Sequence, residues 1–583
     1  MPRDAVTYDN EGVAAVLDEI GDLLELKGEN VFRAVTYRAV ARAIRDLREP
    51  IAALVEQDRL SEIPKVGPSV RDAIEQLVST GTSQRHEELK AAVPSGLITL
   101  LRVPGVGPAT ARIIYDNLKI TTVDELEEAA KAHRLRELPK IQAKTEENIL
   151  RSIASLKQRT GRTLLHHARD AATSMVDWLR QETGIEAISV AGSLRRYRET
   201  IGDIDLLVAS TAPGPVMDAL VRAPAVERVL AHGETKTSVI VARGLQIDLR
   251  VVPPDSWGAA LVYFTGSKEH NVRLRGYALK KKLLLNEYGL YRVGAEARGE
   301  EIASRTEEEL YAALGMAWIA PELREDHGEI DAALGQTLPD LVSLEEIRGD
   351  LHTHTNWTDG RDTLASMARR ARDKGYAYYA VTDHSPGLGM TNGLGAERIT
   401  ARVEEARRLN EELAPFQILV GTEVDIRANG TLDYPDEMLA RFDIVSASVH
   451  SAFGQTREVM TERVLTAMRH PLVTQVSHPT GRLLERRDPH ALDLQALIDA
   501  AAETGTWIEI NGGPERLDLP DIWVRKALHK GVTLVANSDA HSTEELDWME
   551  YAVATARRGW ATRAAIANTS APREMLARRK RRG

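Results

Sequence analysis

The chain has no cysteine, and only 5% of its 583 residues are Phe, Trp or Tyr. Without thiols it cannot form disulfides, thiolate zinc fingers, iron–sulfur clusters or a cysteine nucleophile. It also lacks any apolar run of the roughly 18 residues that a membrane helix needs. No apolar signal core follows its N-terminus. We therefore expect a cytoplasmic protein that makes no contact with a membrane.

The composition is otherwise that of folded domains. Hydrophobic residues make up 43% and charged residues 28% of the chain, which excludes a fully disordered chain or a fibre. At about 100–200 residues per domain, the length predicts three or more domains, each with its own core.

The net charge of −11 is concentrated in one segment. Residues 301–350 hold 3 Lys or Arg and 13 Asp or Glu, so the rest of the chain is nearly neutral. The overall charge therefore does not argue against nucleic-acid binding, for which local basic clusters matter more. We interpret residues 321–348 as an acidic linker between domains. The basic run Arg578–Arg582 is expected to be a disordered tail.

A short pattern is repeated in the N-terminal part. Ile63–Pro68 reads hydrophobic-Pro-x-hydrophobic-Gly-Pro, Val103–Pro108 repeats it, and Leu138–Ala143 is a degenerate third copy. Each copy leads into an apolar pattern that is typical of a helix. Glycine permits a tight turn, and the exposed N–H groups of that turn and of the next helix can hold a phosphate.

These repeats resemble the helix-hairpin-helix motif, which binds the DNA backbone without reading its sequence. Because Gln142 replaces the hairpin glycine of the third copy, we expect that copy not to bind DNA. The alternative is a set of helical hairpins that pack only for stability. The resemblance implies DNA contacts at Gly67, Gly105 and Gly107.

Three carboxylates are placed for phosphoryl transfer. Asp203 and Asp205 lie two residues apart on a predicted strand, so both side chains leave the same face. Asp248 lies in another predicted strand, Leu245–Val252. Carboxylates on adjacent strands can hold two magnesium ions. Such a pair stabilises both the attacking and the leaving oxygen.

Residues 192–205, which begin Gly-Ser-Leu-Arg-Arg and end Gly-Asp-Ile-Asp, resemble the nucleotidyltransferase superfamily. Residues 263–275, Tyr-Phe-Thr-Gly-Ser-Lys-Glu-His-Asn-Val-Arg-Leu-Arg, narrow the resemblance to the family X DNA polymerases. The resemblance implies that Asp203, Asp205 and Asp248 are catalytic and bind Mg²⁺ or Mn²⁺.

The same resemblance implies a nucleotide pocket. Ser193 and Arg196 would meet the triphosphate, Asn271 the base and Arg275 the template. Tyr263 and Phe264 would pack against the sugar. The implied nucleotide-binding set is Gly192, Ser193, Arg196, Gly202, Tyr263, Phe264, Gly266, Asn271 and Arg275.

The first 80 residues resemble the 5′-phosphate-binding domain of those polymerases. The resemblance implies DNA contacts at Arg33, Tyr37 and Arg38, next to Phe32. Ala73 stands where lyase-active relatives carry a Schiff-base lysine. Because that chemistry requires an amine, we expect no deoxyribose-phosphate lyase activity from this position.

The C-terminal part holds nine potential metal ligands, and almost all of them follow a predicted strand. Strands alternate with helices there, which predicts a parallel barrel or a doubly wound sheet. Barrel enzymes carry their chemistry at the C-terminal ends of the strands. Imidazole and carboxylate groups together suit zinc, manganese or iron. The nine residues are His352, His354, Asp359, His384, Glu423, His450, His478, Asp539 and His541.

This set resembles the polymerase and histidinol phosphatase (PHP) domain, a (β/α)₇ barrel with a trinuclear metal site. All nine positions of the family pattern are filled, so we expect two or three Zn²⁺, Mn²⁺ or Fe ions and an active site. Asp383 lies beside a ligand and is expected to support the ligands rather than bind metal.

The motif order predicts a multidomain chain with the following parts: a helical 5′-phosphate-binding domain (1–85), a helix-hairpin-helix or fingers domain (86–160), an α/β palm (161–255), a thumb (256–320), the acidic linker (321–348) and a PHP barrel (349–583). This order resembles the bacterial and archaeal family X DNA polymerases over nearly the whole chain.

The resemblance implies a monomeric, nucleoid-associated repair polymerase. It would fill short gaps in DNA that carries a 5′-phosphate, use deoxynucleoside triphosphates, and carry a 3′–5′ exonuclease in the PHP domain. Two alternatives remain open: a phosphatase of small phosphate esters, and a non-catalytic scaffold that binds DNA ends.

Overall fold

A computed structural model describes the chain from residue 10 to residue 580. Within that range it omits 28–30, 46, 48–50, 94–96, 98–99, 102, 104–105, 160–161, 186, 294–298 and 388–390. The chain forms two compact units, Met1–Thr160 and Gly161–Gly583. No helix among the described residues is long and apolar enough to cross a membrane.

The first unit is helical, and its two intact repeats begin helices as predicted. Gly67 and Gly107 are the residues immediately before α4 and α7, and a proline occupies the first helical position in each case. Proline favours that position because its missing N–H would have no helical partner there. The helices are α1 (Asn10–Lys27), α2 (Val31–Arg45), α3 (Ile51–Glu56), α4 (Pro68–Thr80), α5 (Gln84–Ala92), α7 (Pro108–Leu118), α8 (Val123–Lys131) and α9 (Ala143–Arg159).

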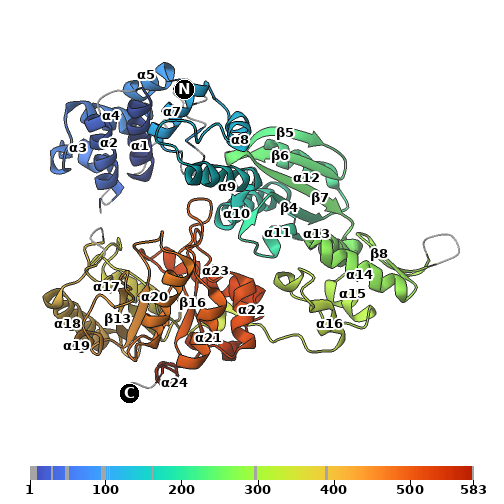
Figure 1. Ribbon diagram of the computed structural model, residues 1–583. Coiled ribbons are helices and arrows are strands. Elements are labelled where there is room, and N and C mark those ends of the chain that lie inside the picture. Colours follow the sequence, from blue (N-terminus) through green and yellow to red (C-terminus); the bar gives the residue numbers. More distant parts are fainter. Residues whose placement is uncertain are drawn as a thin grey trace. The chain divides into compact units, whose positions relative to one another are not determined.

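The second unit begins with a five-stranded sheet of order β2-β4-β7-β6-β5 (Figure 1). Alternate residues of β4 and β7, such as Ile204 and Ile247, pack against α10 (Leu165–Thr183) and α12 (Pro213–Arg222) in one core. The residues between them point to the other face. The strands are β2 (Ile188–Val190), β4 (Asp203–Ala209), β5 (Val226–His232), β6 (Lys236–Val241) and β7 (Leu245–Val252).

A second sheet, of order β10-β9-β8, follows the first. It packs with helices in a core of its own that includes Leu290 and Leu310. The elements are α13 (Trp257–Thr265), α14 (Lys268–Lys280), β8 (Leu283–Asn286), β9 (Gly289–Arg292), β10 (Glu301–Ala303) and α15 (Glu307–Ala313).

The acidic segment is folded over most of its length. It contains η4 (Pro321–Leu323), α16 (Glu329–Leu334) and η5 (Leu344–Glu346). Ile330 belongs to the same core as α15, and the Val342 N–H donates to the carbonyl oxygen of Ala561 at 2.9 Å.

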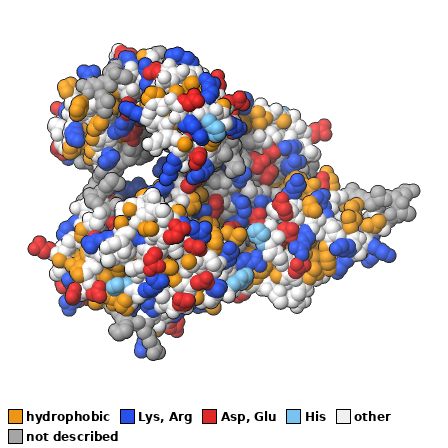
Figure 2. Space-filling model, viewed as in Figure 1, with side chains coloured by type: hydrophobic (Ala, Val, Ile, Leu, Met, Phe, Trp, Pro, Cys, Tyr) orange, Lys and Arg blue, Asp and Glu red, His pale blue; other side chains and the backbone are white. Residues whose placement is uncertain are grey.

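On the face in Figure 2, acidic and basic side chains are interspersed, so the net charge does not make this face uniformly negative.

The C-terminal part is a parallel barrel of seven strands in sequence order, which decides between the two predicted architectures. A parallel bridge between Thr353 and Ala540 joins the first and last strand regions. The strands are β11 (Gly349–Asp350), β12 (Tyr378–Val381), β13 (Gln417–Asp425), β14 (Ile444–Ser448), β15 (Gln475–Val476), β16 (Trp507–Asn511) and β17 (Leu534–Asn537).

Helices follow most of the barrel strands (Figure 1). They are α17 (Leu364–Asp373), α18 (Ala396–Leu413), α19 (Asp436–Leu439), α20 (Arg457–Arg469), α21 (Leu494–Thr504), α22 (Asp521–His529), α23 (Met549–Arg558) and α24 (Pro572–Ala577).

The prediction of a disordered basic tail is wrong for its first three residues. Arg578 donates to the carbonyl oxygen of Ile566 at 3.2 Å, and Lys580 donates to that of Met468 at 2.9 Å. These contacts attach the tail to the barrel, because carbonyl groups at the ends of helices and strands accept bonds from cationic side chains.

Candidate functional site

The three predicted carboxylates meet at one edge of the first sheet. Asp205 of β4 lies directly opposite Asp248 of β7 in the parallel register. One oxygen from each of Asp203, Asp205 and Asp248 lies within 4.8 Å of the others. They lie on the face opposite the α10–α12 core, as the two-residue alternation predicts.

Gly192 leaves room for this cluster. It has φ +58° and begins the short helix α11 (Gly192–Arg195). A Cβ atom at this position would lie only 2.2 Å from Oδ2 of Asp205. Any other residue would therefore displace the carboxylate.

The pKa of Asp205 lies well above its usual range. Burial is the main cause, and the charges of Asp203 and Asp248 add to it, so the pKa rises to about 7. Burial alone would also raise the pKa of Asp248. Lys236, which donates a hydrogen bond to Asp248 at 2.7 Å and carries a positive charge, instead lowers the pKa of Asp248 below its usual range. Crowded carboxylates of this kind favour binding of a divalent cation.

Most of the predicted nucleotide-pocket residues lie in α11, α13 and α14, and Arg196, Gly202 and Gly266 lie in the turns beside these helices and β4. The Tyr263 and Phe264 rings contact edge to face, with centroids 5.1 Å apart. The Asn271 amide donates to the Tyr263 carbonyl oxygen at 2.6 Å. The guanidinium of Arg275 lies 5.9 Å from the Tyr263 ring centroid. These four side chains therefore form one group.

Arg196 is engaged by protein groups in this structure. Its Nε lies 3.1 Å from Oε1 of Glu325, and another guanidinium nitrogen donates to the Thr265 carbonyl oxygen. A Cβ at Gly266 would lie 3.1 Å from Arg196 Nη1, and one at Gly202 would lie 3.3 Å from Nη1 of Arg162. Ser193 follows Gly192 in α11.

The structure divides the predicted DNA contacts of α2 into two pairs. Phe32 and Arg33 are exposed, Phe32 to 82%. Tyr37 is buried and donates to the Ser69 carbonyl oxygen at 3.2 Å. Arg38 forms ion pairs with Asp22 and Glu25 at 2.7 and 2.8 Å. Both Tyr37 and Arg38 already have internal partners, and the DNA contacts of this segment stay a prediction.

The hairpin glycines have open surroundings. Cβ atoms at Gly67 and Gly107 would meet no atom within 4 Å. Both residues have negative φ values, −94° and −77°, so the backbone itself does not require glycine there. Gly105 lies outside the described residues.

All nine predicted ligands meet at the C-terminal ends of the barrel strands. They form four overlapping groups: His354, Asp359, His384 and His541; His352, His354 and Asp539; His352, Glu423 and His478; and His384, Glu423 and His450. Glu423 connects two of the groups. Its carboxylate lies 2.8 Å from Nε2 of His478 and 3.0 Å from Nδ1 of His384.

Two of the nine predicted ligands, both buried histidines, have ring nitrogens with no hydrogen-bond partner among the described residues. They are Nε2 of His352 and both ring nitrogens of His354. Carboxylate oxygens lie near them without forming hydrogen bonds, with Asp539 3.2 Å from Nε2 of His354 and Glu423 3.4 Å from Nε2 of His352. Unpaired buried polar atoms are costly, and a cation held between these nitrogens and carboxylates would satisfy both. The donors are imidazole nitrogens and carboxylate oxygens, which fits transition-metal ions.

Carboxylates behind the ligands fix their orientation. Glu509 accepts from Nδ1 of His352 at 2.7 Å, and Asp425 from Nδ1 of His450 at 2.6 Å. Although burial lowers the pKa of His450, the charges of Glu423 and Asp425 raise it to about 9. Sequence reasoning missed Glu509 and Asp425. Glu509 is a charged residue within the apolar strand β16, and Asp425 is the last residue of β13.

Asp383 lies outside the four groups and is bonded to protein groups. It is fully buried and accepts from the backbone N–H of Thr355 at 2.8 Å and from Arg402 at 3.0 Å. These bonds hold the loop after β11, which carries Asp359, against the end of β12.

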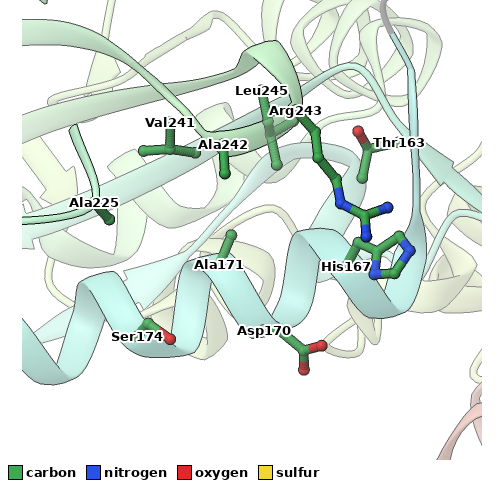
Figure 3. A pocket seen from close by; sticks show the side chains of 10 residues that line it. All are labelled: Thr163, His167, Asp170, Ala171, Ser174, Ala225, Val241, Ala242, Arg243 and Leu245. Atoms are coloured by element: carbon green, nitrogen blue, oxygen red, sulfur yellow. The ribbon is translucent and has the colours of Figure 1, made fainter. Parts of the chain in front are cut away.

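A hollow of about 300 Å³ opens on the palm between α10 and the β6–β7 turn (Figure 3). It shares no residue with either ligand cluster. Figure 3 shows Arg243 and His167 on one side of its apolar floor. The lining is Thr163, His167, Asp170, Ala171, Ser174, Ala225, Val241, Ala242, Arg243 and Leu245.

Four family models match the chain in the predicted order. A helix-hairpin-helix domain matches residues 8–83, and a SAM-like helix-hairpin-helix tandem matches residues 97–155. The DNA polymerase beta thumb matches residues 260–325, and the PHP domain matches residues 350–511.

Full-length similarity identifies the family. The chain is 37% identical over 571 residues to DNA polymerase/3′–5′ exonuclease PolX of Bacillus subtilis. The aligned residues make up 98% of this chain and 99% of that protein. DNA polymerase lambda of Arabidopsis thaliana is 24% identical to this chain, and the alignment covers 54% of this chain and 62% of the polymerase. A probable phosphatase of Acetivibrio thermocellus is 31% identical to this chain, and the alignment covers 34% of this chain and 80% of the phosphatase. The chain belongs to the family X DNA polymerases that carry a C-terminal PHP domain.

Proposed function

We propose that this protein is a DNA polymerase that fills short gaps during DNA repair and that its barrel is a 3′–5′ exonuclease. The observation that carries the polymerase activity is the Asp203, Asp205 and Asp248 cluster, within 4.8 Å, on adjacent parallel strands next to α11. Full-length similarity to a polymerase and exonuclease supports the combination.

In the palm, the chain would bind and align the reacting groups. The three carboxylates would hold Mg²⁺ or Mn²⁺, which lowers the pKa of a 3′-hydroxyl and neutralises triphosphate oxygens when bound. The N-terminus of α11 with Ser193, and Arg196, would orient the triphosphate for attack at its α-phosphorus, with release of pyrophosphate. Tyr263 and Phe264 would pack against the sugar, and Asn271 would contact the base.

In the barrel, nine side chains would hold two or three Zn²⁺, Mn²⁺ or Fe ions, which activate water for phosphodiester hydrolysis when bound. Glu423 would share two of the sites, since it contacts both His478 and His384. Glu509 and Asp425 would fix the ring orientations of His352 and His450. The product of each cycle would be a nucleoside monophosphate.

The substrates would be gapped or nicked duplexes with a 5′-phosphate, together with deoxynucleoside triphosphates. Gly67 and Gly107 would let phosphates approach the helix N-termini of α4 and α7. Phe32 and Arg33 would add contacts near the 5′ end. We infer a monomer that acts at the nucleoid.

Lyase chemistry is not part of this proposal. Ala73 is buried in α4, in the core of the first unit, and it has no amine. Borohydride should therefore trap no covalent adduct on a 5′-deoxyribose-phosphate substrate. Efficient trapping would require a different nucleophile.

The test uses a 5′-labelled primer on a duplex with a one-nucleotide gap and a 5′-phosphate. Reactions contain Mg²⁺ or Mn²⁺, with and without deoxynucleotides, and are resolved on a sequencing gel. One-step extension with nucleotides and a shortening ladder without them are expected. Shortening alone would leave a nuclease whose palm only binds DNA, and neither product would favour a scaffold.

A phosphatase of small phosphate esters is the second candidate, because the barrel matches a probable phosphatase over 80% of that protein. Turnover of histidinol phosphate far faster than degradation of DNA would favour it.

A further inference from the structure

We propose that Arg558, in the barrel, is a positioning residue for deoxynucleotide binding in the palm. It would act through Arg196 and Glu325, so the inference rests on the proposed role of Arg196 as a triphosphate contact. Neither sequence motif contains Arg558, which lies 362 residues from Arg196 in the chain.

The first observation is a bond across the boundary between barrel and palm. One Nη of Arg558 donates to the backbone carbonyl oxygen of Arg196 at 2.6 Å. Arg196 is the residue immediately after α11, the helix that begins at Gly192 beside the carboxylates. A bond from a charged donor at this point fixes the end of the turn that presents Ser193 and Arg196.

The second observation is a shared carboxylate. Oε1 of Glu325 lies 3.0 Å from Arg558 Nη1, 3.1 Å from Arg196 Nε and 3.8 Å from Arg198 Nη1. Although burial raises the pKa of Glu325, the three guanidinium groups hold it below its usual range. Arg558 and Arg196 share one oxygen of Glu325, and the positive charge of Arg558 repels that of Arg196, so Arg196 is held there less firmly than by Glu325 alone.

The two contacts act in the same direction. A triphosphate must compete with Glu325 for the guanidinium of Arg196, and Arg558 weakens that competitor. The backbone bond meanwhile keeps Arg196 at the end of α11. Loss of Arg558 would therefore leave Arg196 more tightly paired with Glu325 and less well placed for the triphosphate.

Arg558 is itself held rigidly. Its side chain is 3% exposed, and its other Nη donates to Asp521 of α22 at 2.6 Å. The next residue, Gly559, permits this packing, since a Cβ there would lie 2.3 Å from Cγ1 of Val524. The α22–α23 pair thus fixes the guanidinium before it meets the palm.

Arg557 is a matched control. It is the neighbouring arginine of α23, and its Nε donates to Glu322 at 2.8 Å while Nη1 donates to the Val342 carbonyl oxygen at 3.0 Å. Among the described residues, none of its bonds reaches Arg196 or Glu325. Arg557→Met therefore removes an arginine from the same helix and leaves the shared carboxylate intact.

The experiment measures steady-state gap filling and exonuclease rates on the full chain for Arg558→Met, Arg558→Lys and Arg557→Met. Arg558→Met should raise KM for the deoxynucleotide about tenfold, with a smaller change in kcat, because a charged hydrogen bond is lost. Arg558→Lys should recover part of the loss. Arg557→Met should leave KM unchanged, and the exonuclease rate, which reports a folded barrel, should persist in all three.

Two further variants separate this inference from the proposed function. Arg558→Met combined with Glu325→Gln should return KM towards the wild-type value, because the competing charge is gone; a general loss of structure would not be rescued this way. Arg196→Ala should raise KM by itself. If it does so while Arg558→Met does not, the inference is overturned and the proposed function stands. If neither raises KM, the triphosphate role of Arg196 fails and the inference fails with it.

Discussion

Gly192 and the carboxylate of Asp205 occupy adjoining space, such that a Cβ on the glycine would lie 2.2 Å from Oδ2 of the aspartate. The left-handed backbone of Gly192, with φ +58°, excludes most other residues as well. Gly192→Ala should therefore displace Asp205 and lower gap filling about 100-fold or more. The exonuclease rate should stay near that of the wild type.

Gly214 offers a matched control for this change. It lies in α12 of the palm, and a Cβ there would meet nothing within 4 Å. Gly214→Ala should keep full polymerase activity. Equal losses in the two variants would show that the palm tolerates no added methyl group, and the argument for Gly192 would not hold.

The barrel should depend on Glu509 for its metal content. Glu509 accepts from His352 Nδ1 at 2.7 Å and from the His478 backbone N–H at 2.7 Å. Glu509→Gln should weaken metal binding about 10- to 100-fold, as loss of such a supporting carboxylate does elsewhere. Metal retained after dialysis, measured by mass spectrometry, is the readout. Glu503→Gln, at an exposed position of α21, should retain the wild-type metal content.

The hairpin glycines should affect DNA binding without affecting stability. Gly67→Ala and Gly107→Ala each add a methyl group that meets no protein atom. Each should remove about one phosphate contact, so the slope of log affinity against log salt should fall by about 1. Fluorescence anisotropy on gapped DNA measures this slope. Gln142→Ala should leave it unchanged, and a large drop in unfolding temperature for either glycine variant would contradict the open geometry.

A buried charge network predicts a pH-dependent stability. Burial alone would raise the pKa of Glu307, but the charges of Arg324 and Arg195 hold it at about 2. Because the folded-state pKa lies below the unfolded value, the stabilisation is present above about pH 4.5 and is lost as the pH falls towards 2. It amounts to about 3 kcal/mol at neutral pH, since one pKa unit corresponds to about 1.4 kcal/mol.

Glu307→Gln isolates this contribution. Its urea-unfolding midpoint should lie well below that of the wild type at pH 7, and the gap should narrow as the pH is lowered from 4.5 towards 2. A gap that is the same at both ends of that range would contradict the ionised state of Glu307. The exposed neighbour Glu308 has no role in the network, so Glu308→Gln is the control.

Local patterns predicted the cluster of three carboxylates because its members follow strand periodicity. The two-residue spacing of Asp203 and Asp205 placed both on one face, and the register with Asp248 completed the cluster. The potential metal ligands of the barrel were likewise predictable, since almost all of them follow an apolar run. The alternation of strands and helices predicted a parallel sheet, but it did not decide between a barrel and a doubly wound sheet.

Contacts between distant segments were not predictable in this way. Nothing in the local sequence of Arg558 indicates Arg196 as its partner, because packing of α23 against the palm brings them together. The internal contacts of Tyr37 and Arg38 were not predictable for a related reason. Their internal partners, Ser69, Asp22 and Glu25, come from other helices, and the periodicity of α2 does not reveal them.

The central claim is that one chain carries two separate active sites, and one comparison tests it directly. Extension and degradation of the gapped, 5′-labelled substrate would be measured for the wild type, Asp205→Ala and His450→Ala, after each is shown to be folded. Asp205→Ala should abolish extension and keep degradation, and His450→Ala should do the reverse. Loss of both activities in either folded variant would contradict two independent sites.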